Sequence, residues 1–327
     1  MFILGINAYH GDSSACLVMD GKLISAAEEE RFRRIKHWAG FPSQAINYCL
    51  QEAGVGLEQV GHVAVNTNPN ANLFEKISYT LRNRPDWQFV LDRIKNKRKQ
   101  IGIEDELTKA YPGQSFRGQV HHIEHHLAHL ASAHTVSPFE ESVTVSVDGF
   151  GDFSSAAWGV GRGGRIEVDQ QVLFPHSLGI FYQAMTQFLG FPQYGDEYKI
   201  MGLAPYGKPT YLEQMRQMVK TKPDGSYELE LRFFRHHVEK IDYEWRGGSP
   251  TVGDLFSKEV EPLLGFPRRG KDESLEKDHY DLARSVQAMY EDAFFHLIEH
   301  LHATHRLESL ALAGGCAMNS VANGKVL

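Results

Sequence analysis

The turn HGDSSA (residues 10–15) joins two predicted strands near the start of the chain. Residues 2–8 are mostly apolar and predict a buried strand, and residues 15–19 predict its partner. An Asp-Gly pair at 20–21 is a strong signal for a two-residue hairpin, which predicts a third strand at 22–27. The chain therefore begins with three strands that are joined by tight turns.

A similar turn occurs again in the middle of the chain. Here FGDFSSA (150–156) lies between strands predicted at 143–147 and 156–160, and a further strand is predicted at 165–173. Repetition over such a length indicates two related lobes rather than a solenoid. Paired hairpins of this kind are found in the actin-like ATPase (ASKHA, ribonuclease H-like) fold, where backbone N–H groups and small side chains can approach phosphates closely.

We therefore predict an α/β protein with this bilobal fold. The first lobe is expected at 1–140, with a helical insertion at about 69–118. The second lobe is expected at 141–327, with an insertion at about 208–275, and to be cut short at the C-terminus. The first insertion carries basic and aromatic residues, which would suit a nucleic-acid patch, but the acidic balance of the whole chain favours a solvated helical insertion.

Histidines are concentrated in VHHIEHHLAHLASAH (120–134), which holds six of the 17 histidines. On a helix, His125 and His129 lie four residues apart on one face, within about 6 Å of each other. Two imidazoles in this arrangement can bind one divalent metal ion, and Asp148, at the end of a predicted strand, adds a carboxylate. The alternative is that these histidines cap the helix or face solvent. The combination with Asp148 favours a metal site.

Three other segments have patterns that could indicate a ligand or metal site. The glycine turn AGGCAMN (313–319) leads into a helix that is predicted from Ser320, a geometry that can bind anions or a nucleotide. Residues 195–207 predict a loop, punctuated by glycine and proline, that could contact a polar ligand or merely cap a helix. His296 and His300 are also four apart, but no carboxylate turn accompanies them, and we predict a partly buried pair without metal.

Composition narrows the class of protein. The 42% hydrophobic and 11% aromatic content suits a soluble globular protein, and the net charge of −7 argues against one that coats nucleic acid. Three cysteines without paired spacing favour a reduced, cytoplasmic compartment. We expect neither a signal peptide nor a membrane span, because no apolar stretch approaches about 20 residues. The sequence leaves a homodimer open.

The sequence resembles the NodU/CmcH-type O-carbamoyltransferases, whose N-terminal part is similar to the Kae1/TsaD proteins. The resemblance runs through the chain from end to end. Its motifs are GINAYHGDSSA (5–15), RIKH with FP (34–42), EHHLAHLASA (124–133), SVDGFGD (146–152), YKIMGLAPYG (198–207) and GGCAMN (314–319).

The resemblance implies a specific chemistry. ATP and carbamoyl phosphate would be substrates that a C-terminal YrdC-like domain converts to carbamoyl-adenylate, and the Kae1-like part would transfer the carbamoyl group to a hydroxyl of a small molecule or sugar. His125, His129 and Asp148 would bind the metal, with Fe²⁺ favoured and Zn²⁺ or Mg²⁺ as alternatives. The metal would polarise the carbamoyl carbonyl or neutralise phosphate charge.

The same resemblance implies roles for other residues. His10 and Asp12 would be catalytic, at the position where a base for the acceptor hydroxyl is expected. The residues expected to bind the nucleotide or carbamoyl-adenylate are Lys36, Asp152, Lys199, Gly314, Gly315 and Asn319.

The sequence also departs from the family pattern. It lacks the YrdC-like domain and a further metal carboxylate, so we expect a fragment of a longer enzyme that is inactive alone. Two other readings stay open: a small-molecule kinase with the actin-like fold, and a non-catalytic module that binds nucleotide, metal or tRNA. The sequence does not identify the acceptor.

Overall fold

The computed structural model describes residues 1–83, 102–244 and 249–326. The described chain forms two compact units, each with its own core. The main part of unit 1 is Met1–His125, and unit 2 comprises His126–Glu244 and Thr251–Leu327. The predicted domain ranges 1–140 and 141–327 stay a prediction.

Unit 1 is built on a five-stranded sheet in the order β3-β2-β1-β4-β5. Strands β1 to β3 form two antiparallel pairs, and β4 and β5 add in parallel beside β1. The strands are β1 (Phe2–Asn7), β2 (Ser14–Met19), β3 (Lys22–Glu28), β4 (Val60–Val65) and β5 (Gln119–His122). The helices are α1 (Glu30–Arg33), α2 (Ser43–Ala53), η1 (Leu57–Gln59), α3 (Leu73–Asn83) and α5 (Ile103–Ala110).

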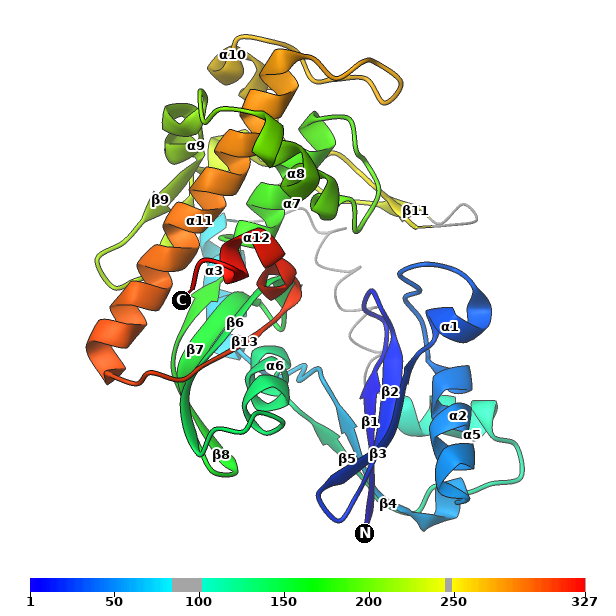
Figure 1. Ribbon diagram of the computed structural model, residues 1–327. Coiled ribbons are helices and arrows are strands. Elements are labelled where there is room, and N and C mark those ends of the chain that lie inside the picture. The colour runs from blue at the N-terminus through cyan, green and yellow to red at the C-terminus, as the bar shows by residue number, and fades with distance from the viewer. Residues whose placement is uncertain (84–101, 245–248, 327) are drawn as a thin grey trace. The chain divides into compact units, whose positions relative to one another are not determined.

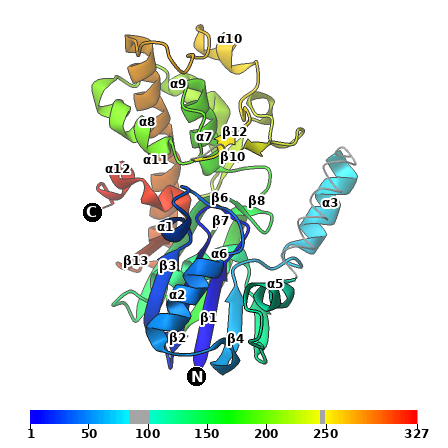
Figure 2. The ribbon, with the colours of Figure 1, turned by 90° about the vertical axis from the view of Figure 1, so that its right-hand side faces the viewer.

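Helix α2 covers one face of this sheet (Figure 2). Its apolar residues recur at helical spacing, and those that are buried are Ala45, Ile46, Cys49 and Leu50. They pack with the inward-facing side chains of β1 and β4, such as Leu4 and Val63, which are fully buried. Gly54 ends the helix in the left-handed conformation, with a φ of 64°, as the sequence predicts.

Unit 2 is built on a four-stranded sheet in the order β13-β6-β7-β8. Strands β6 to β8 form two antiparallel pairs, and β13 adds in parallel beside β6. The strands of this sheet are β6 (Glu141–Gly151), β7 (Ser154–Arg162), β8 (Arg165–Leu173) and β13 (Leu310–Ala313). Shorter strands are β9 (Val219–Thr221), β10 (Tyr227–Leu229), β11 (Tyr243–Glu244) and β12 (Thr251–Val252).

The long helix α11 (Lys277–His305) runs beside α7 (Leu178–Phe188), α8 (Glu197–Leu203) and α9 (Leu212–Met218) (Figure 1). Its buried stripe includes Leu282, Val286 and Leu297, which join β6 and α7 in one hydrophobic core. The other helices of unit 2 are α7 (Leu178–Phe188), α8 (Glu197–Leu203), η2 (Ala204–Tyr206), α9 (Leu212–Met218), η3 (Leu231–Phe233), α10 (Val260–Leu264), η4 (Gly315–Met318) and α12 (Ser320–Asn323). Helix α6 (His125–His134) begins at the residue where the two units meet in the chain.

The predicted fold class is confirmed by the strand order of the two sheets. Each sheet has three consecutive antiparallel strands, followed by a later strand that pairs in parallel with the first of the three. This is the strand pattern of the ribonuclease H-like, actin-like ATPase fold. None of the helices that the structure describes has the length and apolarity that crossing a membrane requires.

One sequence prediction about local structure was wrong. The predicted loop 195–207 contains α8 and η2, because tertiary packing of the buried Ile200 outweighs the glycines around it. In the histidine-rich stretch, Gln119–His122 extends the sheet as β5 before α6 begins. Helices α3 and α5 lie within the range of the predicted first insertion, while residues 84–101 lie outside the described residues.

A buried carboxylate holds the start of α2 in unit 1. Glu29 is fully buried, and its Oε1 accepts a hydrogen bond from Arg33 Nε at 2.8 Å. Its Oε2 accepts from the backbone N–H of Ala45 at 2.8 Å, in the first turn of α2. Glu29 thereby satisfies an otherwise unpaired N–H group and places a negative charge at the positive end of the helix dipole.

We predict that Glu29→Gln lowers the free energy of unfolding by about 2 to 3 kcal/mol. Removal of one partner from a buried ion pair costs about 3 to 5 kcal/mol, and solvent reduces this value because Arg33 is partly exposed. Denaturant titration gives the measurement. Glu28→Gln is the matched control: its ion pair with Arg31 is exposed, so the loss should stay below about 0.5 kcal/mol. Equal losses in the two variants would contradict the role of Glu29.

Candidate functional site

Helix α6 is fixed on strand β6 by two histidine–serine hydrogen bonds. His126, Leu130 and His134 recur every fourth residue and form the buried face of the helix. His126 Nδ1 lies 2.9 Å from Ser146 Oγ, and His134 Nδ1 lies 2.8 Å from Ser142 Oγ. These two contacts define both the rotation of the helix and its position along the strand.

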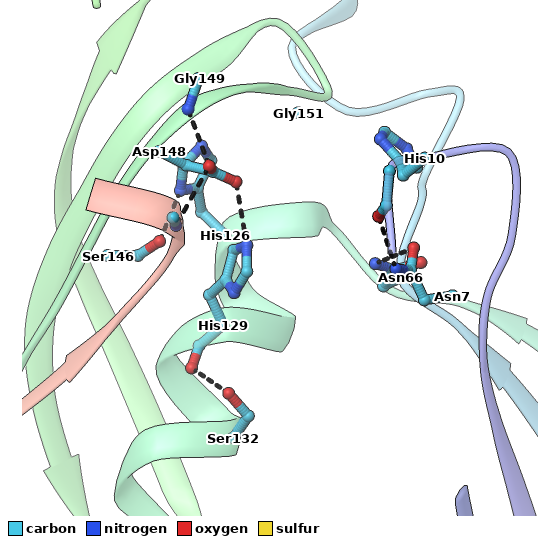
Figure 3. Close-up of polar contacts among 12 residues, drawn as sticks. Asn7, His10, Asn66, His126, His129, Ser132, Ser146, Asp148, Gly149 and Gly151 are labelled. Carbon is cyan, nitrogen blue, oxygen red and sulfur yellow. Dashed lines mark hydrogen bonds and ion pairs between the residues drawn. The ribbon is translucent and has the colours of Figure 1, made fainter. Parts of the chain in front are cut away.

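The helix presents two further histidines next to the end of β6. His129 Nε2 lies 3.1 Å from Asp148 Oδ2 (Figure 3). His125, one turn earlier in α6, completes a group whose ligand atoms all lie within 4.8 Å of one another. The three residues that the sequence predicts as metal ligands are therefore brought together by one helix and one strand.

The carboxylate of Asp148 is held by backbone groups. Its Oδ1 accepts a hydrogen bond from the N–H of Gly149 at 2.8 Å and from the N–H of Gly315 at 3.2 Å. Ser177 Oγ donates to the Asp148 carbonyl at 3.1 Å and to the Gly149 carbonyl at 2.8 Å. One carboxylate oxygen is thus engaged by the backbone, while the other points toward His129.

This donor set fits a divalent transition metal. Two ligand atoms bound to one metal ion at about 2.1 Å lie about 3 Å apart, which matches the spacing of His129 Nε2 and Asp148 Oδ2. Two imidazoles and a carboxylate leave coordination positions for a substrate and suit Fe²⁺ or Zn²⁺ better than Mg²⁺. The side chains of His129 and Asp148 are 28% and 24% exposed, so a ligand can reach them.

A cavity of about 540 Å³ opens beside this cluster within unit 2. It is lined by His129, by the whole of β13 and by the glycine turn at Gly314, with Phe139 and Met318 among its apolar walls. Gly314 has a φ of 89°, and a Cβ there would lie 2.3 Å from the carbonyl oxygen of Val147. Only glycine fits this position, because any other residue would push the turn away from β6.

The comparisons with known proteins identify the family of the chain. The family described as "Carbamoyltransferase N-terminus" matches residues 2–327. The chain belongs to this carbamoyltransferase family. It is 35% identical to the uncharacterized protein sll1178 of Synechocystis sp., over 99% of this chain and 52% of that protein. It is 32% identical to the nodulation protein NolNO of Sinorhizobium fredii, over 98% of this chain and 43% of that protein.

The chain spans about half the length of these curated relatives. Among solved structures, component A of the (R)-2-hydroxyglutaryl-CoA dehydratase of Acidaminococcus fermentans has a TM-score of 0.46 at 12% identity, covering 99% of this chain and 86% of that one. HypF of T. kodakarensis has a TM-score of 0.44 at 12% identity, covering 98% of this chain and 42% of that one. Likenesses of this strength carry no functional conclusion.

The other predicted nucleotide-binding residues of unit 2 have varied surroundings. Gly315 donates to Asp148, as described above, and Asp152 lies in the β6–β7 turn with a φ of 50°. Lys199 pairs with Asp196, its Nζ 2.7 Å from Oδ1. Asn319 is buried, caps α12 through the N–H of Ala322, and exchanges hydrogen bonds with Gln287. Their roles in binding a nucleotide stay a prediction.

The predicted catalytic residues belong to the β1–β2 connection of unit 1. His10 Nε2 lies 3.3 Å from Thr67 Oγ1, and Asp12 Oδ1 lies 2.8 Å from His37 Nδ1. Lys36 is exposed. His37 was not predicted as a site residue, although it directly follows Lys36 in the RIKH motif. Among the described residues, Asp12, Glu30 and His37 form a second group with metal-ligand spacing.

The sequence analysis also missed the structural role of two histidines. His126 and His134 are 0% and 1% exposed and hold the helix on the strand. The sequence pattern that could have predicted this role lies in β6, where Ser142, Thr144 and Ser146 alternate with valines. Such alternation predicts one polar face along the strand, and that face lies against α6.

Burial raises the pKa of the Cys316 thiol well above its usual value, and the nearby carboxylates of Asp148 and Glu197 raise it further.

We predict that the purified protein binds about one iron or zinc ion per chain, and that His125→Ala or His129→Ala abolishes this binding, because two ligands cannot hold the ion tightly. Elemental analysis of the purified variants gives the measurement. His302→Ala is the control, because this exposed histidine pairs with Glu308 at the end of α11. Unchanged metal content in both ligand variants would rule out the site.

Proposed function

We propose that this chain is the part of an O-carbamoyltransferase that transfers a carbamoyl group from carbamoyl-adenylate to a hydroxyl of a small molecule or sugar. Membership of the carbamoyltransferase family supports group transfer. The observation that carries the proposal is the meeting of His125, His129 and Asp148 beside a cavity in unit 2. A kinase of this fold has no requirement for such a metal-binding set.

In this proposal the metal cluster binds the carbamoyl and phosphate groups of the donor, and the cavity binds its nucleoside. A bound metal ion would polarise the carbamoyl carbonyl and offset the charge of the phosphate that leaves. Asp148 would keep its position during this step, because the N–H groups of Gly149 and Gly315 hold its Oδ1. The adjacent cavity, at about 540 Å³, lies in the range typical of pockets for small-molecule ligands and could take the nucleoside of an adenylate.

The glycine turn supports binding of the donor in the same cavity. Because Gly314 lacks a Cβ, the backbone there can approach a ligand closely. We propose that Gly314, Gly315 and Asn319 face the nucleotide, and that Lys36, Asp152 and Lys199 contact its phosphate or the carbamoyl group. We propose that His10 and Asp12 are catalytic residues that act on the acceptor hydroxyl.

We propose that a longer protein, of the same length as these relatives, forms carbamoyl-adenylate from ATP and carbamoyl phosphate. The matched region covers 52% of one relative and 43% of another, so about half of each lies outside it. We propose that this chain alone does not form the adenylate and that a YrdC-like domain supplies that step.

We predict that the full-length protein consumes carbamoyl phosphate only in the presence of ATP and yields AMP and pyrophosphate from ATP together with inorganic phosphate from carbamoyl phosphate. Release of these products follows from an adenylate intermediate, whereas a kinase would yield ADP. Chromatographic analysis of the nucleotides gives the measurement, and mass spectrometry of hydroxylated acceptors detects the added carbamoyl group. Formation of ADP, or tight and salt-sensitive retention of tRNA without any transfer, would contradict the proposal.

A further inference from the structure

Strand β3 forms one edge of the sheet of unit 1 (Figure 2). Its inner side pairs with β2 from Lys22 to Glu28. On its outer side no strand of the described residues lies beside it, so about half of its backbone N–H and C=O groups point outward without a partner strand. Such an edge is a template for a further strand, and proteins either protect it or use it.

This edge carries large apolar side chains that are exposed. Leu23 is 61% exposed and Ile24 is 38% exposed. Met19, at the end of β2, is 37% exposed. The second half of β3 has only small apolar side chains, Ala26 and Ala27. The strand is therefore bulky near one end and narrow near the other.

The two ends of β3 carry opposite charges. Lys22 begins the strand and is exposed, and Glu28 ends it with a side chain that is 43% exposed. Glu28 Oε2 accepts a hydrogen bond from Arg31 at 3.1 Å, and a carboxylate has acceptor positions for a second cation as well. A strand with this order of charges is complementary to an antiparallel copy of itself.

One antiparallel register pairs these charges at both ends. If Ser25 lies opposite Ser25 of a second copy, Lys22 of each copy lies opposite Glu28 of the other. A parallel arrangement would instead place lysine opposite lysine and glutamate opposite glutamate, which is unfavourable. A shift of two residues toward the hairpin turn would bring Glu28 opposite Asp20, where two carboxylates repel each other.

The same register also matches the side chains by size. Leu23 of one copy lies opposite Ala27 of the other, and Ile24 lies opposite Ala26. Each bulky side chain thus meets a small one across the pair, and no two bulky side chains compete for one place. Pairing would remove the exposed apolar surface of Leu23 and Ile24 from water, which favours association.

The alternative is that β3 is an edge protected against pairing. A register shift opposite Leu17 and Val18 leaves Ile24 as a bulge, and a lysine on an edge strand often blocks a neighbour. Both devices act against unlimited stacking of sheets. A twofold pair is closed, because it uses β3 of both copies, and its lysines are matched by glutamates. The pattern favours one specific partner over a blocked edge.

We propose that two copies of this chain pair through their β3 strands, antiparallel and centred on Ser25, so that their unit 1 sheets become one continuous sheet. The partner is a second copy because the charges and sizes along β3 complement those of the same strand reversed. Each copy contributes seven residues of β3. This is a small interface, so we expect a dissociation constant of about 1 to 100 µM.

Charge reversal in the full-length protein tests the register. Lys22→Glu and Glu28→Lys each turn two attractive pairs into two repulsive ones, and each should raise the dissociation constant of the dimer about 10- to 100-fold. An equimolar mixture of the two variants should form a dimer again, because each pair between the copies then joins a lysine to a glutamate. The double variant should dimerise as the unaltered protein does. Sedimentation velocity over a range of concentrations gives the measurement.

Two matched controls separate this effect from a change in net charge. Glu104→Lys alters an exposed residue of α5 in unit 1, and Lys258→Glu alters an exposed residue of unit 2. Both should leave the dissociation constant unchanged.

Amide hydrogen exchange of the unaltered protein locates the contact without any variant. The amides of Lys22–Glu28 should exchange more slowly above the dissociation constant than below it. The amides of β5, at the opposite edge of the same sheet, should show no such dependence on concentration.

Several results would overturn the proposal. They are a monomer at about 1 mM, a dimer that both single reversals leave intact, or two monomeric variants whose mixture does not associate. Exchange at β3 that does not depend on concentration would also overturn it, and this measurement decides the question if a variant fails to fold. None of these outcomes depends on the proposed carbamoyl transfer.

Discussion

The register of helix α6 on strand β6 is the constraint from which the candidate metal site follows. Ser142 and Ser146 hold His134 and His126, and the next residue on the same face of the strand is Asp148. His129 meets that carboxylate because it lies on the adjacent face of a helix whose rotation is already fixed. Gly161 has no Cβ, which would lie 2.4 Å from the His134 ring, so the helix can approach the sheet closely.

The same principle operates in unit 1, where backbone contacts hold side chains in place. Ser13 ties the β1–β2 connection to Gly40, and Glu29 joins the segment after β3 to the start of α2. These buried groups carry no chemistry themselves, but they hold Asp12 and His37 in a strained and fixed arrangement. Buried serines in both units, and a buried glutamate in unit 1, thus support neighbouring side chains that could react.

The fold class and the metal-ligand cluster could be predicted from the sequence, because both follow from local patterns of residues. The alternating apolar strands, the paired turns and the His125–His129 spacing predict the fold class and the cluster that the structure brings together. The start of α6 and the helix α8 could not be predicted, because they depend on pairing and burial far along the chain. The His37–Asp12 contact was missed for the same reason: it requires the fold of two segments that no periodicity connects.

The most direct test of this account is the metal affinity of Ser146→Ala, a variant that removes no ligand. If Ser146 sets the position of α6 through His126, the dissociation constant for Fe²⁺ or Zn²⁺ should rise about 10- to 100-fold, as for other supporting residues of metal sites. Thr135→Ala, at an exposed residue just after α6, should leave it unchanged. An affinity that Ser146→Ala does not alter would contradict the claim that the helix–strand register builds the site.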